Sequence, residues 1–223
     1  MDVVQITGDG DTTTPGAAER LRQAGGLFDP DRFTANTYLV RGERTVLIDA
    51  GSLPGVAAAV EGFTDTLDAV VLTHQHGDHV AQLDAVLSAF DPALYAFGDH
   101  PRRTAELVDG ETVQLGDEPF EVLHTPGHAD DHVVLYSDST LFAGDLVAAN
   151  DQAFDYGSFG GTGGPGPARE RLIESLERLL DALPAGVEHL YGGHGDPFHG
   201  DVHDVVATAL RRAEERAPKY PDR

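Results

Sequence analysis

A short stretch that follows a predicted strand carries four side chains that can bind a metal ion. It reads His74-Gln75-His76-Gly77-Asp78-His79. In the extended chain after the apolar run 68–71, residues two apart point the same way, so His74 and His76 aim their imidazoles at one point. Gly77 permits a sharp turn, and the apolar stripe from residue 80 onward predicts a helix whose first residues are Asp78 and His79. The sequence therefore predicts a strand-to-helix junction that binds metal.

Three more candidate ligands stand at the ends of later predicted strands. His128 follows the run 120–123, Asp145 follows the run 140–142, and His194 follows the run 188–191. A glycine directly before each of them lets the backbone approach a metal closely. The chain has no cysteine, so histidine and carboxylate must supply the protein ligands, and disulfides and a cysteine nucleophile are excluded.

Short β-rich runs and apolar helical stripes come in batches along the chain. The expected strands are 38–40, 45–48, 70–72, 94–97, 120–123, 133–136, 140–142 and 188–191. Residues 41–44 and 137–139 have the length of turns, so each is expected to close a hairpin. The expected helices are 54–63, 80–90, 172–183 and 201–217, each with one apolar face to bury.

This order of elements combines hairpins with helices and lacks strict alternation of strand and helix. It predicts an α/β fold, an αββα sandwich of two mixed β-sheets with helices on the outer faces. Without a repeat or a low-complexity linker, the chain is expected to be one domain over residues 1–223. The glycine-rich stretch 157–166 is expected to be either a plain connector or a mobile loop beside the metal site.

The six-residue motif resembles the His-x-His-x-Asp-His signature of the metallo-β-lactamase superfamily, and every position of it is matched. The resemblance extends to the three later ligands, which occur in the family's order. It implies the metallo-β-lactamase fold and a centre for two divalent metal ions, with zinc expected first and iron or manganese as alternatives. It assigns His74, His76 and His128 to the first metal, Asp78, His79 and His194 to the second, and Asp145 to a bridge between them.

The chemistry of such a centre follows from its two cations. Metal ions about 3.5–4 Å apart can share a hydroxide, because each lowers the pKa of bound water toward about 7. The resemblance thus implies a metal-dependent hydrolase with no covalent intermediate on a side chain. Asp78 is a ligand and also a candidate proton acceptor. Asp49, at the end of the run 45–48, is expected to hydrogen-bond a metal-bound histidine, since the family commonly has an aspartate at this strand end.

Six histidines have no position in the signature and are expected to be structural or on the surface. They are His100, His124, His132, His189, His199 and His203. Among them, His132 lies close enough in sequence to His128 to contact the residues that surround the metals.

Within the superfamily, the chain resembles the small hydrolases related to glyoxalase II, which cleave thioesters. A small thioester, ester or lactone is therefore the expected substrate. Those enzymes usually carry Cys-Gly-Arg after the bridging aspartate, whereas residues 146–151 read Leu-Val-Ala-Ala-Asn-Asp and no basic residue occurs before Arg169. Basic residues that would bind a glutathione carboxylate are not evident near the C-terminus, although Arg211 and Arg212 lie on the last expected helix.

Two other enzyme classes fit the same motif. A persulfide dioxygenase would hold one Fe(II) with His74, His128 and Asp145, a two-histidine, one-carboxylate set that leaves positions open for O₂. The segment 125–132 also resembles endoribonucleases of this fold. Phosphate contacts need lysine or arginine, however, and Lys219 is the only lysine, so nucleic acid is not favoured as a partner.

Acidic residues outnumber basic ones by 38 to 15, for a formal net charge of −23. This pattern resembles proteins adapted to concentrated salt, where a Debye length of about 3 Å at 1 M screens self-repulsion, so a halophilic source is expected. No apolar run approaches the roughly 20 residues of a membrane span. Residues 1–5 lack the features of a secretory signal, so a cytoplasmic protein is expected. The sequence leaves the oligomeric state open.

Overall fold

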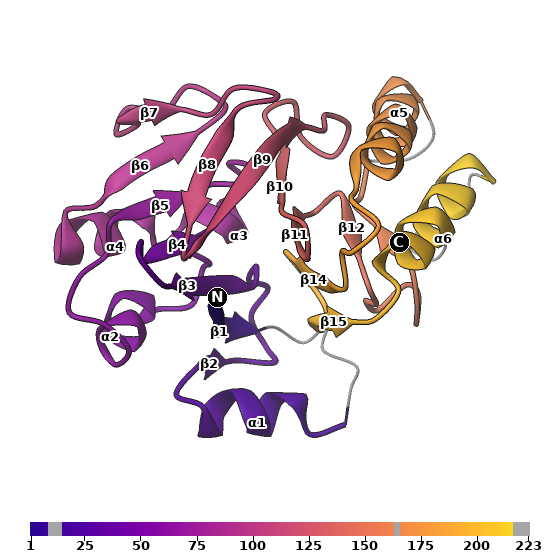
Figure 1. Cartoon of the computed structure of the whole chain (residues 1–223). Helices are drawn as coiled ribbons and strands as arrows, with labels where there is room; N and C mark the ends of the chain where they lie inside the picture. Colours follow the sequence, from indigo (N-terminus) through magenta and orange to yellow (C-terminus); the bar gives the residue numbers. More distant parts are fainter. Residues whose placement is uncertain (9–14, 163–165, 216–223) are drawn as a thin grey trace.

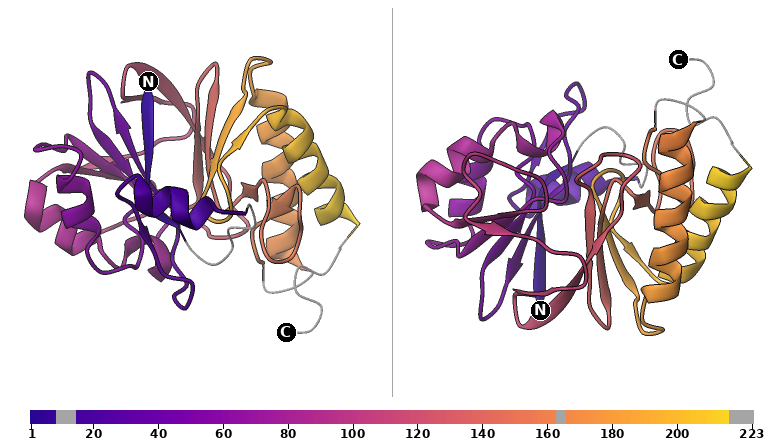
Figure 2. Two further views of the ribbon diagram at one scale, coloured as in Figure 1. Left: turned by 90° about the horizontal axis from the view of Figure 1, so that it is seen from below. Right: turned by 90° about the horizontal axis from the view of Figure 1, so that it is seen from above.

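Two mixed β-sheets pack face to face, and helices cover both outer faces (Figures 1 and 2). The computed structural model describes residues 1–8, 15–162 and 166–215 of the chain. The order of layers is helix, sheet, sheet, helix (Figure 2), as expected from the batches of strands and helices. No helix of the described residues is long and apolar enough to cross a membrane.

The first sheet is built from the N-terminal half of the chain. Its seven strands in the described residues run in the order β2 (Leu27–Phe28), β1 (Asp2–Gly8), β3 (Thr37–Arg41), β4 (Val46–Ile48), β5 (Ala69–Val71), β6 (Ala93–Ala96) and β7 (Ala105–Glu106). The expected hairpin of β3 and β4 is confirmed, and β4 through β7 pair in parallel. This half of the chain also forms α1 (Ala17–Gln23), α2 (Val56–Glu61), α3 (Gly77–Val80) and α4 (Leu83–Phe90).

The second sheet is built from the C-terminal half. Its six strands in the described part run in the order β15 (Phe198–His199), β14 (His189–Gly192), β11 (Thr140–Gly144), β10 (Val133–Tyr136), β9 (Glu118–His124) and β8 (Thr112–Leu115). The hairpin of β10 and β11 is as expected, and β14 pairs in parallel with β11. Helices α5 (Pro167–Ala182) and α6 (Val202–Glu214) lie on the outer side (Figure 2).

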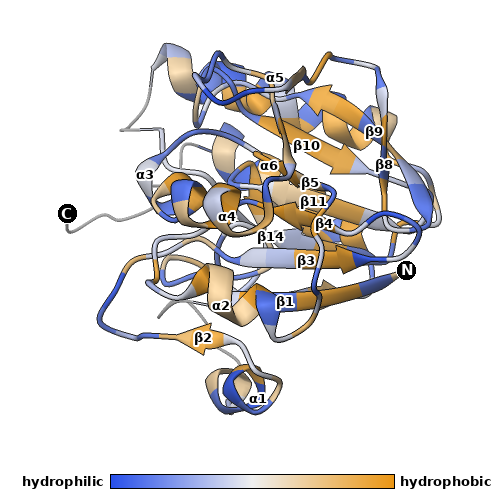
Figure 3. Ribbon diagram, turned by 90° about the vertical axis from the view of Figure 1, so that its left-hand side faces the viewer, coloured by the Kyte–Doolittle hydropathy of each residue, from blue (hydrophilic) through white to orange (hydrophobic). Residues whose placement is uncertain are grey.

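Alternation of side chains along the strands produces the layered core. In β5 and the residue after it, Val70 and Leu72 pack toward the first sheet's helices, while Val71 belongs to the cluster between the sheets. Phe120 and Phe142 fill the same middle layer from the second sheet. Orange, apolar residues accordingly dominate most of the strands, and the helices carry both apolar and polar residues (Figure 3).

The stripe 80–90 forms two helices instead of the single one expected. The break falls at Gln82, whose N–H donates to the carbonyl of Gly51 at 3.1 Å. The carbonyl of Asp78, which would have accepted that bond in a continuous helix, instead accepts from Ala35 at 3.2 Å. These tertiary hydrogen bonds attach the metal-binding motif to the segments around it, which a local apolar pattern cannot reveal.

The glycine-rich stretch 157–166 is more structured than a plain connector at its start. Strand β13 (Ser158–Phe159) pairs antiparallel with β12 (Val147–Ala148), and both of its residues are buried. Residues 163–165 lie outside the described residues. The last helix was expected to reach residue 217, and its described part ends at Glu214.

Candidate metal centre

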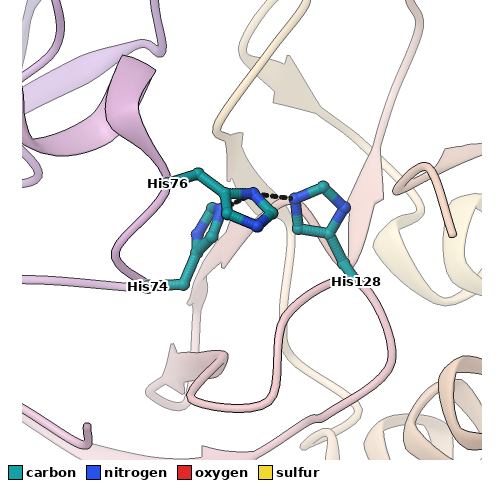
Figure 4. Close-up of side chains that lie close together, drawn as sticks. All are labelled: His74, His76 and His128. Carbon is teal, nitrogen blue, oxygen red and sulfur yellow. Dashed lines mark hydrogen bonds between the residues drawn. The ribbon is translucent and has the colours of Figure 1, made fainter. Parts of the chain in front are cut away.

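Three imidazoles from two loops converge on one point (Figure 4). His74 and His76 follow β5, and His128 follows β9. The Nε2 atom of His74 lies 3.1 Å from Nδ1 of His76, and that Nδ1 atom lies 2.8 Å from Nε2 of His128. Two nitrogens that bind one metal ion at about 2.0–2.1 Å are themselves roughly 3 Å apart, so this spacing suits a shared ion.

A second group of donors lies beside the first. Asp78 Oδ2 is 3.1 Å from His194 Nε2 and 3.7 Å from His79 Nε2. Asp78 and His79 belong to α3, whereas His194 follows β14 in the other half of the chain. The expected second ligand group is therefore brought together across the two sheets.

Asp145 lies between the two groups. Its Oδ2 atom is 3.3 Å from His128 Nε2 and 3.5 Å from His194 Nε2, and its Oδ1 atom is 3.3 Å from His79 Nε2. One carboxylate thus faces histidines from both groups. The structure brings all seven residues expected from the sequence to one place.

Two buried atoms at this place lack the partners that buried polar atoms normally have. Within the described residues, His79 Nε2 and Asp145 Oδ1 form no hydrogen bond. Leaving a buried donor or acceptor unpaired costs roughly 1–3 kcal/mol, and a cation bound between these atoms would remove that cost. Five imidazoles and two carboxylates also form a donor set that suits zinc and similar divalent metals. The residues present therefore fit the implied metal ions.

The pKa shifts indicate which of these side chains are ready to bind a metal ion and which must first lose a proton. Burial lowers the pKa of His74 and of His128 below the usual value of 6.5, so both are neutral ligands at pH 7. Burial opposes ionisation of Asp145, but His194 and His79 outweigh it and hold the pKa of that carboxyl well below 3.8. For His79, burial is outweighed by Asp49 and Asp145, which raise its pKa to about 10. A metal ion must therefore displace a proton from His79.

Asp49 contacts His79, one of the histidines expected to bind metal. Its Oδ2 atom lies 2.7 Å from His79 Nδ1, and both of its oxygens also accept hydrogen bonds from Thr73, through the backbone N–H and the hydroxyl. The carboxylate holds the proton of His79 on Nδ1 and directs Nε2 toward Asp145. Asp49 itself has a φ of 57°, a conformation that aspartate tolerates better than most residues.

His132 holds Asp145 through its backbone, a contact more specific than the sequence suggested. Its Nε2 atom accepts a hydrogen bond from the Asp145 N–H at 2.9 Å, which places the ring proton on Nδ1, 2.8 Å from the hydroxyl of Thr125. Burial first, and then His128, lower the pKa of His132 well below 6.5. The ring is therefore a buried, neutral acceptor.

We expect metal-free protein to lose stability as the pH falls below about 6.5, because the unfolded chain then protonates His132 and the folded chain does not. Each proton of difference lowers the free energy of unfolding by about 1.4 kcal/mol per pH unit. Urea denaturation between pH 5 and 7, after removal of metal, measures this slope. The variant His132→Gln keeps a hydrogen-bond acceptor and cannot titrate, so its free energy of unfolding should fall less steeply with pH, by about 1.4 kcal/mol per pH unit. An equal dependence on pH in the variant and the wild type would contradict this role of His132.

Two glycines leave room for the Asp145 side chain and backbone. A Cβ atom on Gly193 would lie 2.1 Å from Asp145 Oδ1 and 2.9 Å from His79 Cε1. A Cβ atom on Gly160 would lie 2.0 Å from the Asp145 carbonyl and 3.0 Å from His128. Glycine is therefore required at both positions for steric reasons.

The surroundings of the centre include residues that sequence reasoning missed. Phe33, whose side chain is 66% exposed, stacks on the His194 ring with centroids 4.7 Å apart. A cleft of about 470 Å³ opens beside His76 and His128 and is lined by Asp130, Asp131 and Arg171 among others. No local sequence pattern marks Phe33, because its partner lies in the other half of the chain.

A sandwich of two sheets between helices, with five histidines and two aspartates gathered at one edge, is typical of one class of proteins. Residues 30–218 match the family model described as the Metallo-beta-lactamase superfamily. The chain belongs to this superfamily, and the resemblance drawn from the His74–His79 motif is confirmed.

Curated relatives and solved structures agree with this assignment. The chain is 33% identical over 190 residues to a hydroxyacylglutathione hydrolase of Pectobacterium atrosepticum, with 82% of this chain and 66% of that protein covered. It is 28% identical over 200 residues to a lactamase-like protein of Pestalotiopsis microspora, with 82% of this chain and 58% of that protein covered. The chain thus spans less than two thirds of the length of these relatives.

Among solved structures, ETHE1 from Myxococcus xanthus is similar with a TM-score of 0.65 and 25% identity, over 84% of this chain and 88% of that one. The protein TTHA1623, solved in a di-iron-bound form, is similar with a TM-score of 0.59 and 28% identity, over 82% of this chain and 94% of that one.

Proposed function

We propose that the chain is a dinuclear metal-dependent hydrolase that acts on a small thioester, ester or lactone. The observation that carries this proposal is the position of Asp145, whose two oxygens face His79, His128 and His194. A single-metal enzyme has no need for the second donor group of Asp78, His79 and His194. The di-iron-bound form of TTHA1623 supports a pair of metals in a similar protein.

The proposed ligand sets follow the two donor groups. His74, His76 and His128 would hold the first metal ion, Asp78, His79 and His194 the second, and Asp145 both. When bound, two divalent ions, for which we propose zinc, supply a hydroxide near neutral pH and Lewis acidity for the substrate carbonyl.

Protein side chains then control orientation and protons. Asp49 keeps the lone pair of His79 Nε2 directed at the centre, and His132 holds the Asp145 backbone. Asp78 is the proposed proton acceptor, because its Oδ2 atom lies at the second donor group and its side chain is partly exposed. For Asp78, burial opposes ionisation, but the hydrogen bond from His194 together with the charges of His79 and His194 outweighs it and lowers the pKa, so the carboxylate is charged at neutral pH.

The cleft beside His76 and His128 bears on the leaving group. Asp130 and Asp131 line it, and among its described lining residues the one arginine, Arg171, has a nitrogen 2.6 Å from Asp130 Oδ1. Hydroxyacylglutathione hydrolase relatives support thioester cleavage. The acidic lining disfavours the anionic glutathione moiety, so we propose a neutral or cationic leaving group.

The test is an assay of metal-loaded protein on a panel of substrates. The same acyl group is attached to glutathione, to N-acetylcysteamine and to a simple alcohol, and a lactone is added as a fourth substrate. Hydrolysis that chelation abolishes, with N-acetylcysteamine ahead of glutathione, supports the proposal. Oxygen uptake with glutathione persulfide and no hydrolysis of any ester would replace it with the dioxygenase that uses His74, His128 and Asp145.

A further inference from the structure

Two histidines outside the metal centre face one another at the edge of the second sheet. His189 begins β14 and His199 ends β15, and the two residues are direct cross-strand partners. Their Nδ1 atoms lie 2.7 Å apart, and the ring centroids are 4.8 Å apart at 78°. His199 is exposed, and the His189 side chain keeps 36% of its surface exposed, so solvent reaches the pair.

This spacing is close to what a metal ion requires. Two imidazole nitrogens at about 2.0–2.1 Å from one ion are roughly 2.9 Å apart when they bind at right angles and about 3.3 Å apart in a tetrahedron. The observed Nδ1–Nδ1 distance of 2.7 Å needs only a small rotation of the exposed rings to admit an ion. Opposed strands of a hydrogen-bonded pair hold the two side chains in register.

Neighbouring groups set the tautomer of one ring and the protonation state of the other. Glu188 Oε1 lies 3.7 Å from His189 Nε2, which favours a proton on Nε2 and leaves the Nδ1 lone pair toward His199. Burial and the neighbouring His189 lower the pKa of His199 and outweigh the opposing effect of Glu188, so its ring is neutral at pH 7. The net charge of −23 also attracts cations to the surface.

We propose that His189 and His199 form a separate surface site for a divalent transition metal, with water completing the coordination. Imidazole ligands select Cu²⁺, Ni²⁺ and Zn²⁺, with Cu²⁺ bound most tightly. His189 begins β14, whereas His194 follows the other end of that strand. The site is therefore distinct from the metal centre, and an ion in it would tie edge strand β15 to β14.

The test is a count of Cu²⁺ ions on protein whose metal centre is already loaded with zinc. Cu²⁺ is titrated and followed by electron paramagnetic resonance, in which two nitrogen ligands leave a characteristic splitting. We expect the wild type to bind one equivalent more than His199→Asn or His189→Asn. The control variant is His100→Asn, which removes a histidine beyond β6 of the other sheet and should keep the extra equivalent.

Exchange of zinc for copper at the metal centre would occur in every variant, so only the difference between variants is diagnostic. The copper-dependent rise in melting temperature should likewise be lost in either variant of the pair. If the wild type, His199→Asn and His189→Asn bind the same number of Cu²⁺ ions per chain, His189 and His199 only form a hydrogen bond and the proposed site is wrong. The count involves no turnover, so it stands or falls independently of the proposed hydrolase activity.

Discussion

Replacement of Asp145 by asparagine is expected to lower turnover by more than about 100-fold and to leave about one metal ion per chain. The change keeps the size of the side chain and removes the charge that faces His79, His128 and His194. Loss of an outer hydrogen-bond partner costs roughly 10- to 100-fold in metal affinity or activity, and loss of the shared ligand should cost more. Turnover and metal content of Asp145→Asn are the measurements.

The matched variant is Asp49→Asn, which alters a carboxylate that contacts His79 and Thr73 but does not face the space between the donor groups. It should retain both metals at saturating concentration and lose about 10- to 100-fold in affinity or activity. Near-normal turnover with two metals in Asp145→Asn would mean that the carboxylate is not the bridge.

Potassium chloride is expected to raise the melting temperature by on the order of 10 °C between low salt and about 2 M. The net charge of −23 produces self-repulsion in dilute buffer, and salt screens it. At this chain length each kcal/mol of stability is worth about 2–4 °C. Thermal unfolding followed by circular dichroism measures the effect, and a flat curve would remove the inference of a halophilic source.

A variant of α5 separates screening from the general effect of salt on apolar burial. Glu174, Glu177 and Asp181 are exposed and lie three and four residues apart, so they repel one another along the helix. Their replacement by glutamine, glutamine and asparagine should raise the melting temperature at low salt and flatten its dependence on salt. If the melting temperature of this variant depends on salt as steeply as that of the wild type, the salt effect comes from apolar burial and not from screening.

The parts of the structure that were predictable share a local cause. The spacing of His74, His76, Asp78 and His79 around Gly77 directly encodes a strand, a turn and a helix start. The hairpins of β3 with β4 and of β10 with β11 follow from turn-length links between apolar runs. The seven expected ligands meet because each stands at a strand end or helix start on the same edge of the sandwich.

The parts that were missed depend on contacts between distant segments. Strand β1 was not expected, although residues 3–7 read Val-Val-Gln-Ile-Thr, and only its pairing with β3 shows where it joins the sheet. The break at Gln82 depends on the carbonyl of Gly51. The hydrogen bond of His132 to the Asp145 backbone and the stacking of Phe33 on His194 likewise require the folded chain.

The central claim is that two donor groups sharing Asp145 hold two metal ions. Elemental analysis of protein purified without added metal, for the wild type and for His194→Ala, tests it most directly. We expect about two ions per chain in the wild type, and about one ion with a large loss of hydrolysis in His194→Ala. One tightly bound iron per wild-type chain, together with full activity of His194→Ala, would contradict the claim.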